Sequence, residues 1–79
     1  MPTVFKINGF RFYFYSNEND EPMHVHVEKA GANGKIWLDP DVNIAYTHNF
    51  SSKEVQQIME IIATNLLTLK QKWNEYFSQ

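Results

Sequence analysis

Hydrophobic and polar residues alternate along the first half of the chain, which is the pattern of strands with one buried face. The pair Asn8-Gly9 separates two such segments and indicates a tight hairpin turn, because both residues tolerate positive φ angles. A second, four-residue turn is expected at residues 31–34, which begin and end with glycine. The alternation predicts strands at residues 3–7, 10–15, 23–30 and 35–39, and a short fifth strand at 42–46.

The spacing of apolar residues changes from two to three and four in the second half of the chain, which is typical of an amphipathic helix. Ser51 is placed to cap this helix and Glu54 to complete a capping box. The pattern predicts one long helix over residues 52–77. At about 38 Å this helix is longer than the roughly 20 Å of a six-residue strand. We therefore expect it either to bend near Asn65 or to pack its last turns on something other than the sheet.

Together these segments predict an α+β fold in a single domain spanning residues 1–79. A four- or five-stranded antiparallel meander carries the long C-terminal helix on one face. Because the side chains of a strand alternate between faces, the apolar residues face the helix and the polar residues gather on the other side. That opposite face is expected to carry Lys6, Arg11, Tyr13, Tyr15, His24, His26, Glu28, Lys35, Trp37 and Asp39.

Turn lengths decide which of these residues are neighbours across strands. The four-residue second turn sets Asp39 opposite His26, so that Tyr13, His26 and Asp39 form one cross-strand row. The other expected neighbours are Lys6 with Arg11, Arg11 with Glu28, Tyr15 with His24, and Trp37 in the row of Arg11 and Glu28.

Composition narrows the chemistry of the chain. Without cysteine, the fold has no disulfide and no thiolate metal site, and its stability must come from packing of six Phe, four Tyr and two Trp or from a partner chain, a second copy included. The net charge of -2 argues against a general polyanion binder, so RNA binding requires a local basic patch. The N-terminus shows no secretion signal and no stretch is apolar enough to span a membrane, which predicts a cytoplasmic protein without membrane contact.

Two histidines on one strand, with their expected neighbours, suggest acid–base catalysis. His26, oriented by Asp39, is the predicted general acid or base, and His24 or Tyr13 is the second proton carrier. Arg11 is placed to stabilise a developing anion. These are the functional groups of a metal-independent ribonuclease, which needs no cofactor. A surface dyad beside an ion pair, without catalytic function, explains the same residues equally well.

Two other functions fit the same face. The His-x-His spacing places the imidazoles of His24 and His26 on one side of a strand, where they can share a metal ion if Asp39 or Asp41 supplies a third ligand. Alternatively, the tyrosine and tryptophan rings of this face form an apolar patch of the kind that marks protein–protein interfaces. The residues leave both alternatives open.

Several short segments, spread over essentially all 79 residues, form a specific combination. They are Met1-Pro2-Thr3-Val4, Gly9-Phe10-Arg11-Phe12, Phe14-Tyr15-Ser16-Asn17-Glu18, Glu21-Pro22, His24-Val25-His26-Val27, Trp37-Leu38-Asp39-Pro40, Phe50-Ser51 and Trp73-Asn74-Glu75-Tyr76-Phe77. In this combination the chain resembles the bacterial family catalogued as domain of unknown function 4160. The resemblance implies a neighbouring gene for a small protein of the domain of unknown function 2442 type, with which such proteins are grouped as toxin–antitoxin pairs. It carries over no catalytic residue.

The leading hypothesis is therefore the toxin-like member of a two-gene module, acting on RNA or another phosphodiester through His24, His26 and Arg11. The first alternative is a non-enzymatic module that binds a protein partner through the same face. The second alternative is a metal-binding protein. The sequence does not decide whether the chain is an enzyme.

Overall fold

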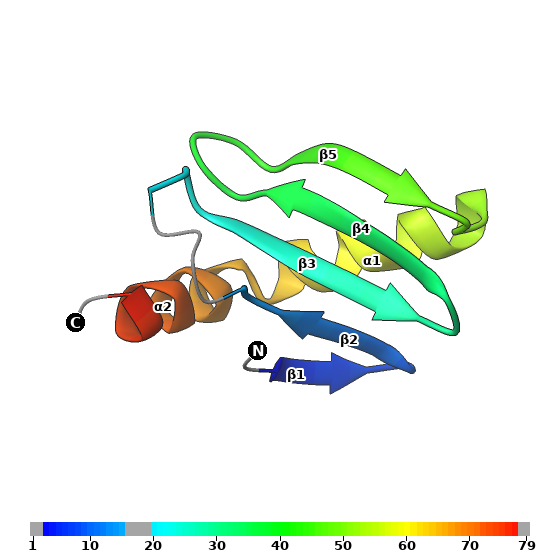
Figure 1. Cartoon of the computed structure of the whole chain (residues 1–79), viewed down its shortest axis with the longest axis horizontal. Coiled ribbons are helices and arrows are strands. Elements are labelled where there is room, and N and C mark those ends of the chain that lie inside the picture. The colour runs from blue at the N-terminus through cyan, green and yellow to red at the C-terminus, as the bar shows by residue number, and fades with distance from the viewer. Residues whose placement is uncertain (1–2, 16–19, 78–79) are drawn as a thin grey trace.

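The N-terminal half of the chain forms a five-stranded antiparallel sheet in which neighbouring strands follow one another in sequence (Figure 1). The structure, a computed structural model, describes residues 3–15 and 20–77. The predicted antiparallel meander is confirmed. The fifth strand, expected to be short, has six residues, as many as the third and fourth strands. The strands are β1 (Thr3–Ile7), β2 (Phe10–Tyr13), β3 (His24–Lys29), β4 (Ala32–Trp37) and β5 (Asn43–His48).

The C-terminal apolar stripe forms two helices, α1 (Ser52–Thr64) and α2 (Leu66–Phe77), so the prediction of one long helix is wrong. The start of α1 is as predicted. The Ser51 hydroxyl accepts a hydrogen bond from the backbone N–H of Glu54, and the Glu54 carboxylate accepts one from the backbone N–H of Ser51. This capping box satisfies two backbone groups that a helix end leaves without a partner.

The two helices meet in a bend at Asn65, one of the two outcomes expected from the length of the apolar stripe. The Asn65 side-chain amide donates a hydrogen bond of 2.8 Å to the Ile61 carbonyl, and its backbone N–H is shared between the carbonyls of Ile61 and Ile62. A side-chain amide that takes a carbonyl of the preceding turn competes with the regular backbone ladder. The helix is interrupted at this residue for that reason.

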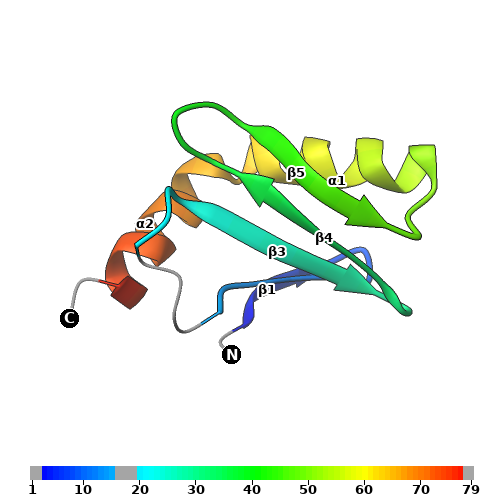
Figure 2. The ribbon, with the colours of Figure 1, turned by 45° about the horizontal axis from the view of Figure 1, so that its top comes forward.

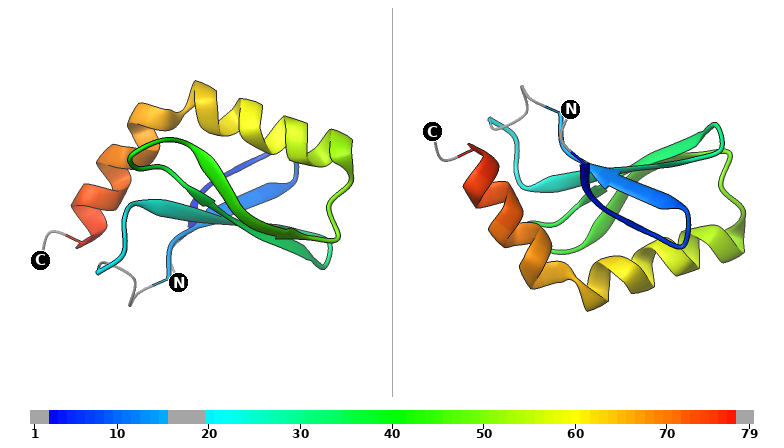
Figure 3. Two further views of the ribbon diagram at one scale, coloured as in Figure 1. Left: turned by 90° about the horizontal axis from the view of Figure 1, so that it is seen from above. Right: turned by 90° about the horizontal axis from the view of Figure 1, so that it is seen from below.

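Both helices lie on the same side of the sheet, and no helix of residues 3–15 and 20–77 covers the other side (Figure 2, Figure 3). α1 runs along the sheet, and after the bend α2 leads toward the end where β3 begins. The apolar residues expected to face the helices do so. No helix in the described part of the chain is both long and apolar enough to cross a membrane. The core consists of Phe10, Phe12, Phe14, Val25, Val27, Ile36, Leu38, Ile58, Ile61, Ile62, Leu69 and Trp73.

The register of the first three strands is the predicted one up to Tyr13, where β2 ends, so the predicted pairing of Tyr15 with His24 is not formed. Arg11 lies opposite Lys6 on one side and Glu28 on the other, and Tyr13 lies opposite His26. The first turn is the expected two-residue turn, which fixes the pairing of β1 with β2. Alternation then brings the predicted polar residues of β2 and β3 to the side without helices.

The second turn is shorter than predicted, and this changes the register of β4. Ala30 and Gly31 form a two-residue turn with φ angles of 49° and 84°, where four residues were expected. His26 consequently pairs with Lys35, and the prediction that placed Asp39 opposite His26 is wrong. Alanine is uncommon at a positive φ angle, which explains why the sequence did not mark Ala30 as a turn residue.

We call the side of the sheet without helices the outer face. Its residues form cross-strand rows, and Trp37 belongs to the row of His24 instead of the predicted row of Arg11 and Glu28. The rows are Lys6–Arg11–Glu28–Asn33–His48, Tyr13–His26–Lys35–Tyr46 and His24–Trp37–Asn43.

Candidate functional site

Four rings from the end of β2, from the residues that follow it and from the start of β3 pack together, and we call them the imidazole cluster: Tyr13, Tyr15, His24 and His26. Tyr13 stacks on His26, with ring centroids 5.5 Å apart, and Tyr15 meets the same imidazole edge-on at 4.4 Å. The two imidazoles are 5.2 Å apart and almost perpendicular. The structure therefore brings together the two histidines and two tyrosines that strand alternation placed on one face.

His24 lies at the end of the sheet between two tryptophans. Its ring centroid is 5.4 Å from that of Trp37 on β4 and 5.0 Å from that of Trp73 on α2. Its Nδ1 lies 2.9 Å from the carbonyl oxygen of Pro22. Because a carbonyl oxygen only accepts hydrogen bonds, Nδ1 must carry a proton, and in the neutral ring Nε2 is then the acceptor. This contact fixes both the tautomer and the orientation of the ring.

Both imidazoles are buried, although they lie on the side of the sheet that no helix covers. The exposed fraction is 0% for His24 and 3% for His26. Among the described residues, no buried side-chain nitrogen or oxygen lacks a hydrogen-bond partner. A general acid or base must come within about 3 Å of the substrate atom it serves. Contact between His26 and a ligand would therefore require the covering rings, Tyr15 among them, to move.

The carboxylate predicted to orient His26 is absent from its row. Asp39 follows the end of β4 and is exposed, whereas Lys35 occupies the position opposite His26. The Lys35 ammonium pairs with the Glu21 carboxylate at 2.7 Å and lies 4.4 Å from the centroid of the Trp37 ring. The predicted His26–Asp39 dyad is therefore not formed, because the two-residue turn shifts β4 along β3.

Arg11 is fixed by contacts on the outer face. Its Nη1 pairs with the Glu28 carboxylate at 2.7 Å, as expected from the register, and its Nε donates to the Thr3 hydroxyl at 2.7 Å. The guanidinium also lies 4.3 Å from the ring centroid of Tyr13. The charge of Arg11 is therefore balanced by Glu28 beside the imidazole cluster, and a developing anion would have to compete with that carboxylate.

Tyr13 is held in its protonated form. Burial is the main cause that raises the pKa of Tyr13 above its ordinary value of 10.0, followed by its hydrogen bond with Tyr15 and the negative charges of Tyr15 and Glu28. The positive charge of Arg11 opposes this change by the smallest amount. A phenol with a raised pKa is a weaker acid than usual at neutral pH. Tyr13 is therefore poorly suited to the predicted task of second proton carrier.

Comparison with known families gives one match. Residues 9–74 match the family described as domain of unknown function 4160. The chain belongs to this family. No curated protein and no solved structure matches the chain. The match includes both imidazoles, and the description of the family names no activity for them.

The described part of this domain of unknown function 4160 shows no group of ligands typical of a metal site. Within residues 3–15 and 20–77, no three His, Cys, Asp or Glu side chains lie close enough together to hold a metal ion. Asp39 and Asp41, expected as sources of a third ligand, lie in the exposed loop between β4 and β5. His24 and His26 therefore have no third ligand of the predicted kind beside them.

One contact of the domain of unknown function 4160 was not predicted from its sequence. Trp73 belongs to the apolar stripe of the predicted helix, and it is buried against Phe14. The stripe contained no indication that the same ring also reaches His24. The bend at Asn65 turns α2 toward the end of the sheet, and only this change of direction brings Trp73 to an imidazole of the outer face.

Proposed function

We propose that this protein is a non-enzymatic binding module that holds a partner protein on the outer face of its sheet. The observation that carries the proposal is the burial of His24 and His26, with Nδ1 of His24 already hydrogen bonded to the Pro22 carbonyl. Catalytic imidazoles must reach a substrate, whereas buried imidazoles that pack between aromatic rings support a surface. The outer face is then a binding surface built on the imidazole cluster.

The exposed residues of this face fit a protein partner. Tyr15 and Tyr46 are 38% and 41% exposed, and tyrosine is among the residues that contribute most to protein interfaces. Tyr46 lies on β5, which is the last strand of the sheet, so its outer edge has unpaired backbone groups. An extended segment of a partner can pair with such an edge while its side chains contact the neighbouring rings.

The partner we propose is the small protein of the domain of unknown function 2442 type that the family resemblance implies. The two proteins would form the toxin–antitoxin pair, with the outer face as their interface. Charges of both signs on this face, Lys6 and Lys35 with Glu28, support a protein surface of mixed charge as the ligand.

Calorimetric titration of the purified chain with the product of its neighbouring gene tests this proposal. Tyr46→Ala should weaken binding at least about tenfold, which corresponds to about 1.4 kcal/mol. Leu67→Ala is the matched control, because Leu67 is also a large exposed apolar residue, 70% exposed, but lies on α2. Absence of binding by the wild-type chain, or equal loss in both variants, would contradict the proposal.

Growth arrest on expression separates this proposal from an RNA-acting toxin. His26→Gln retains a hydrogen-bonding side chain, and its melting temperature shows whether the cluster is intact. We expect arrest, and its relief by the neighbouring protein, to persist in a folded His26→Gln variant. Loss of arrest in a folded variant that still binds the partner would overturn the non-enzymatic proposal in favour of phosphodiester chemistry at His26.

A further inference from the structure

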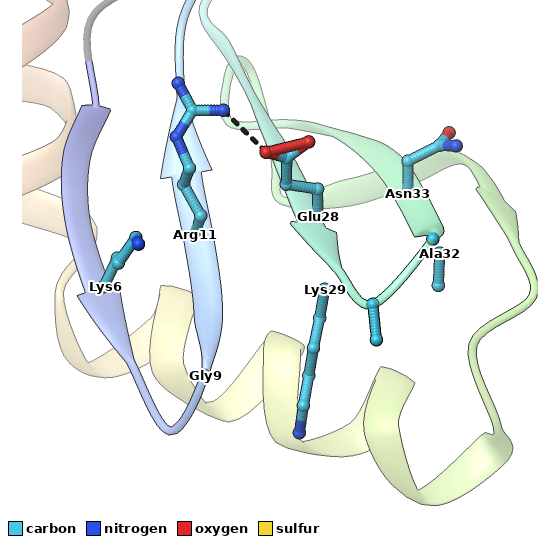
Figure 4. A pocket seen from close by; sticks show the side chains of 9 residues that line it. Lys6, Gly9, Arg11, Glu28, Lys29, Ala32 and Asn33 are labelled. Carbon is cyan, nitrogen blue, oxygen red and sulfur yellow. Dashed lines mark hydrogen bonds and ion pairs between the residues drawn. The ribbon is translucent and has the colours of Figure 1, made fainter.

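A pocket of about 530 Å³ lies between the tips of the two hairpins, at the end of the sheet where β3 ends (Figure 4). This volume lies within the usual range for sites that bind small molecules. Residues of the β1–β2 hairpin and of the β3–β4 hairpin face each other across it. They are Lys6, Gly9, Arg11, Glu28, Lys29, Ala30, Gly31, Ala32 and Asn33.

Lys29 links the two hairpin tips. Its Nζ lies 4.6 Å from the ring centroid of Phe10, and its Cε lies 3.2 Å from the position that a Cβ atom would take at Gly9. Only glycine, which has no side chain, allows the lysine to approach this turn so closely. The ammonium is therefore anchored between the two turns by the shape of the first one.

Positive charge exceeds negative charge in this pocket. Lys6, Arg11 and Lys29 line it against one carboxylate, Glu28, which leaves a formal surplus of two positive charges on a chain whose net charge is -2. Lys6 is exposed, and no ion pair of its ammonium is present in the described part of the chain. Figure 4 shows the side chains of Arg11 and Lys29 pointing in opposite directions, Arg11 toward Glu28 and Lys29 away from it.

We propose that this pocket binds a phosphate group. A phosphate monoester carries nearly two negative charges and three acceptor oxygens, which matches the surplus charge of the lining and the donors of Lys6 and Asn33 better than a single carboxylate does. Two sources supply phosphate groups: a small phosphorylated molecule carries the doubly charged monoester, and an RNA strand carries one negative charge at each of several successive phosphodiesters. The site does not depend on the proposed protein partner, and its test uses other ligands.

Binding is measured by NMR titration of the wild-type chain with pyrophosphate, with adenosine monophosphate and, separately, with a short single-stranded oligouridylate. The amide signals of Gly9 and Gly31 should shift in a saturable way. Lys6→Ala and Lys29→Met should each weaken binding about tenfold or more. Lys72→Ala is the control, because Lys72 is an exposed lysine on α2 that does not line the pocket.

Substitution of the carboxylate in the pocket should have the opposite effect on phosphate affinity to substitution of the lysines. Glu28→Gln keeps an acceptor for Arg11 but removes the one negative charge of the lining, so it should tighten binding several-fold. Glu60→Gln changes the net charge of the chain by the same amount at an exposed position of α1 and should have no effect. A ligand attracted only by overall charge would respond equally to both variants, and this result would overturn the proposal.

The ligand series identifies the source of the phosphate. Saturable binding of pyrophosphate or the mononucleotide, sensitive to both pocket lysines, supports a small phosphorylated ligand. Binding of the oligouridylate alone, with the same sensitivity, supports an RNA backbone in the pocket. No saturable binding of any of the three probes, or an equal effect of Lys72→Ala, would overturn the proposal and leave the protein-binding proposal untouched.

Discussion

The ring of Tyr13 lies against the imidazole of His26, with centroids 5.5 Å apart and planes inclined by 26°. The two residues are direct partners across β2 and β3. Stacked aromatic pairs contribute about 0.5–1.5 kcal/mol beyond the area that they bury. His26 therefore contributes to the stability of the sheet, and any function of this imidazole has to be separated from that contribution.

The raised pKa of Tyr13 predicts a loss of stability in alkali. An unfolded tyrosine loses its proton at pH values above about 10, while the folded Tyr13 keeps it, so the stabilisation is complete below pH 10 and is lost as the pH rises toward the folded pKa. Urea unfolding of the wild type at increasing alkaline pH should show a falling free energy of unfolding. The free energy of unfolding of the Tyr13→Phe variant should fall less over the same pH range. Tyr46→Phe is the control at an exposed ring, and an equal effect of both variants would refute the prediction.

Ala30→Asn should stabilise the protein. Ala30 has a φ angle of 49°, a conformation that costs about 1–2 kcal/mol for most residues and less for asparagine, and Asn-Gly is a favoured pair for this turn. We expect a gain of about 0.5–1 kcal/mol in the free energy of unfolding, measured in urea. Ala63→Asn, at an exposed position of α1, should instead lower stability slightly, since asparagine is a poorer helix former. Unchanged or lower stability of Ala30→Asn would contradict this account of the turn.

Trp73→Ala should destabilise the protein by about 3–5 kcal/mol, a large part of the stability of a small domain. The side chain is 6% exposed and packs against Phe14 and Phe77 in addition to His24. Thermal unfolding measures the effect, with exposed Leu67→Ala expected to change stability by less than about 0.5 kcal/mol. An unchanged melting temperature of Trp73→Ala would show that α2 is not required for the core.

Asp39→Asn should leave the NMR signals of His26 unchanged, because Asp39 is exposed and outside the row of His26. Lys35→Met should shift those signals, because Lys35 is the cross-strand neighbour and the substitution keeps the aliphatic part of the side chain. Imidazole proton spectra of both variants check this. A shift in Asp39→Asn alone would restore the dyad expected from the sequence.

The exposure of the imidazoles was not predictable from alternation. Alternation assigns a side chain to a face of the sheet, and it placed His24 and His26 correctly on the side without helices. Burial of a ring depends on the neighbours that lean over it, which here are Tyr15, Trp37 and, from α2, Trp73. Those contacts join residues up to 49 positions apart in sequence. A local pattern contains no information about them.

The sequence by itself determined the order of the strands, the first hairpin with its pairing of Lys6 and Arg11, the capping box of α1 and the apolar side of the sheet. Each of these follows from residues within a few positions of one another, through turn chemistry or side-chain periodicity. Tertiary structure alone decided that Ala30 accepts a positive φ angle, which moved Lys35 into the place of Asp39. The two registers differ by four residues, an even number, so both place Ile36 and Leu38 on the helix side, and the periodicity of the sequence could not distinguish them.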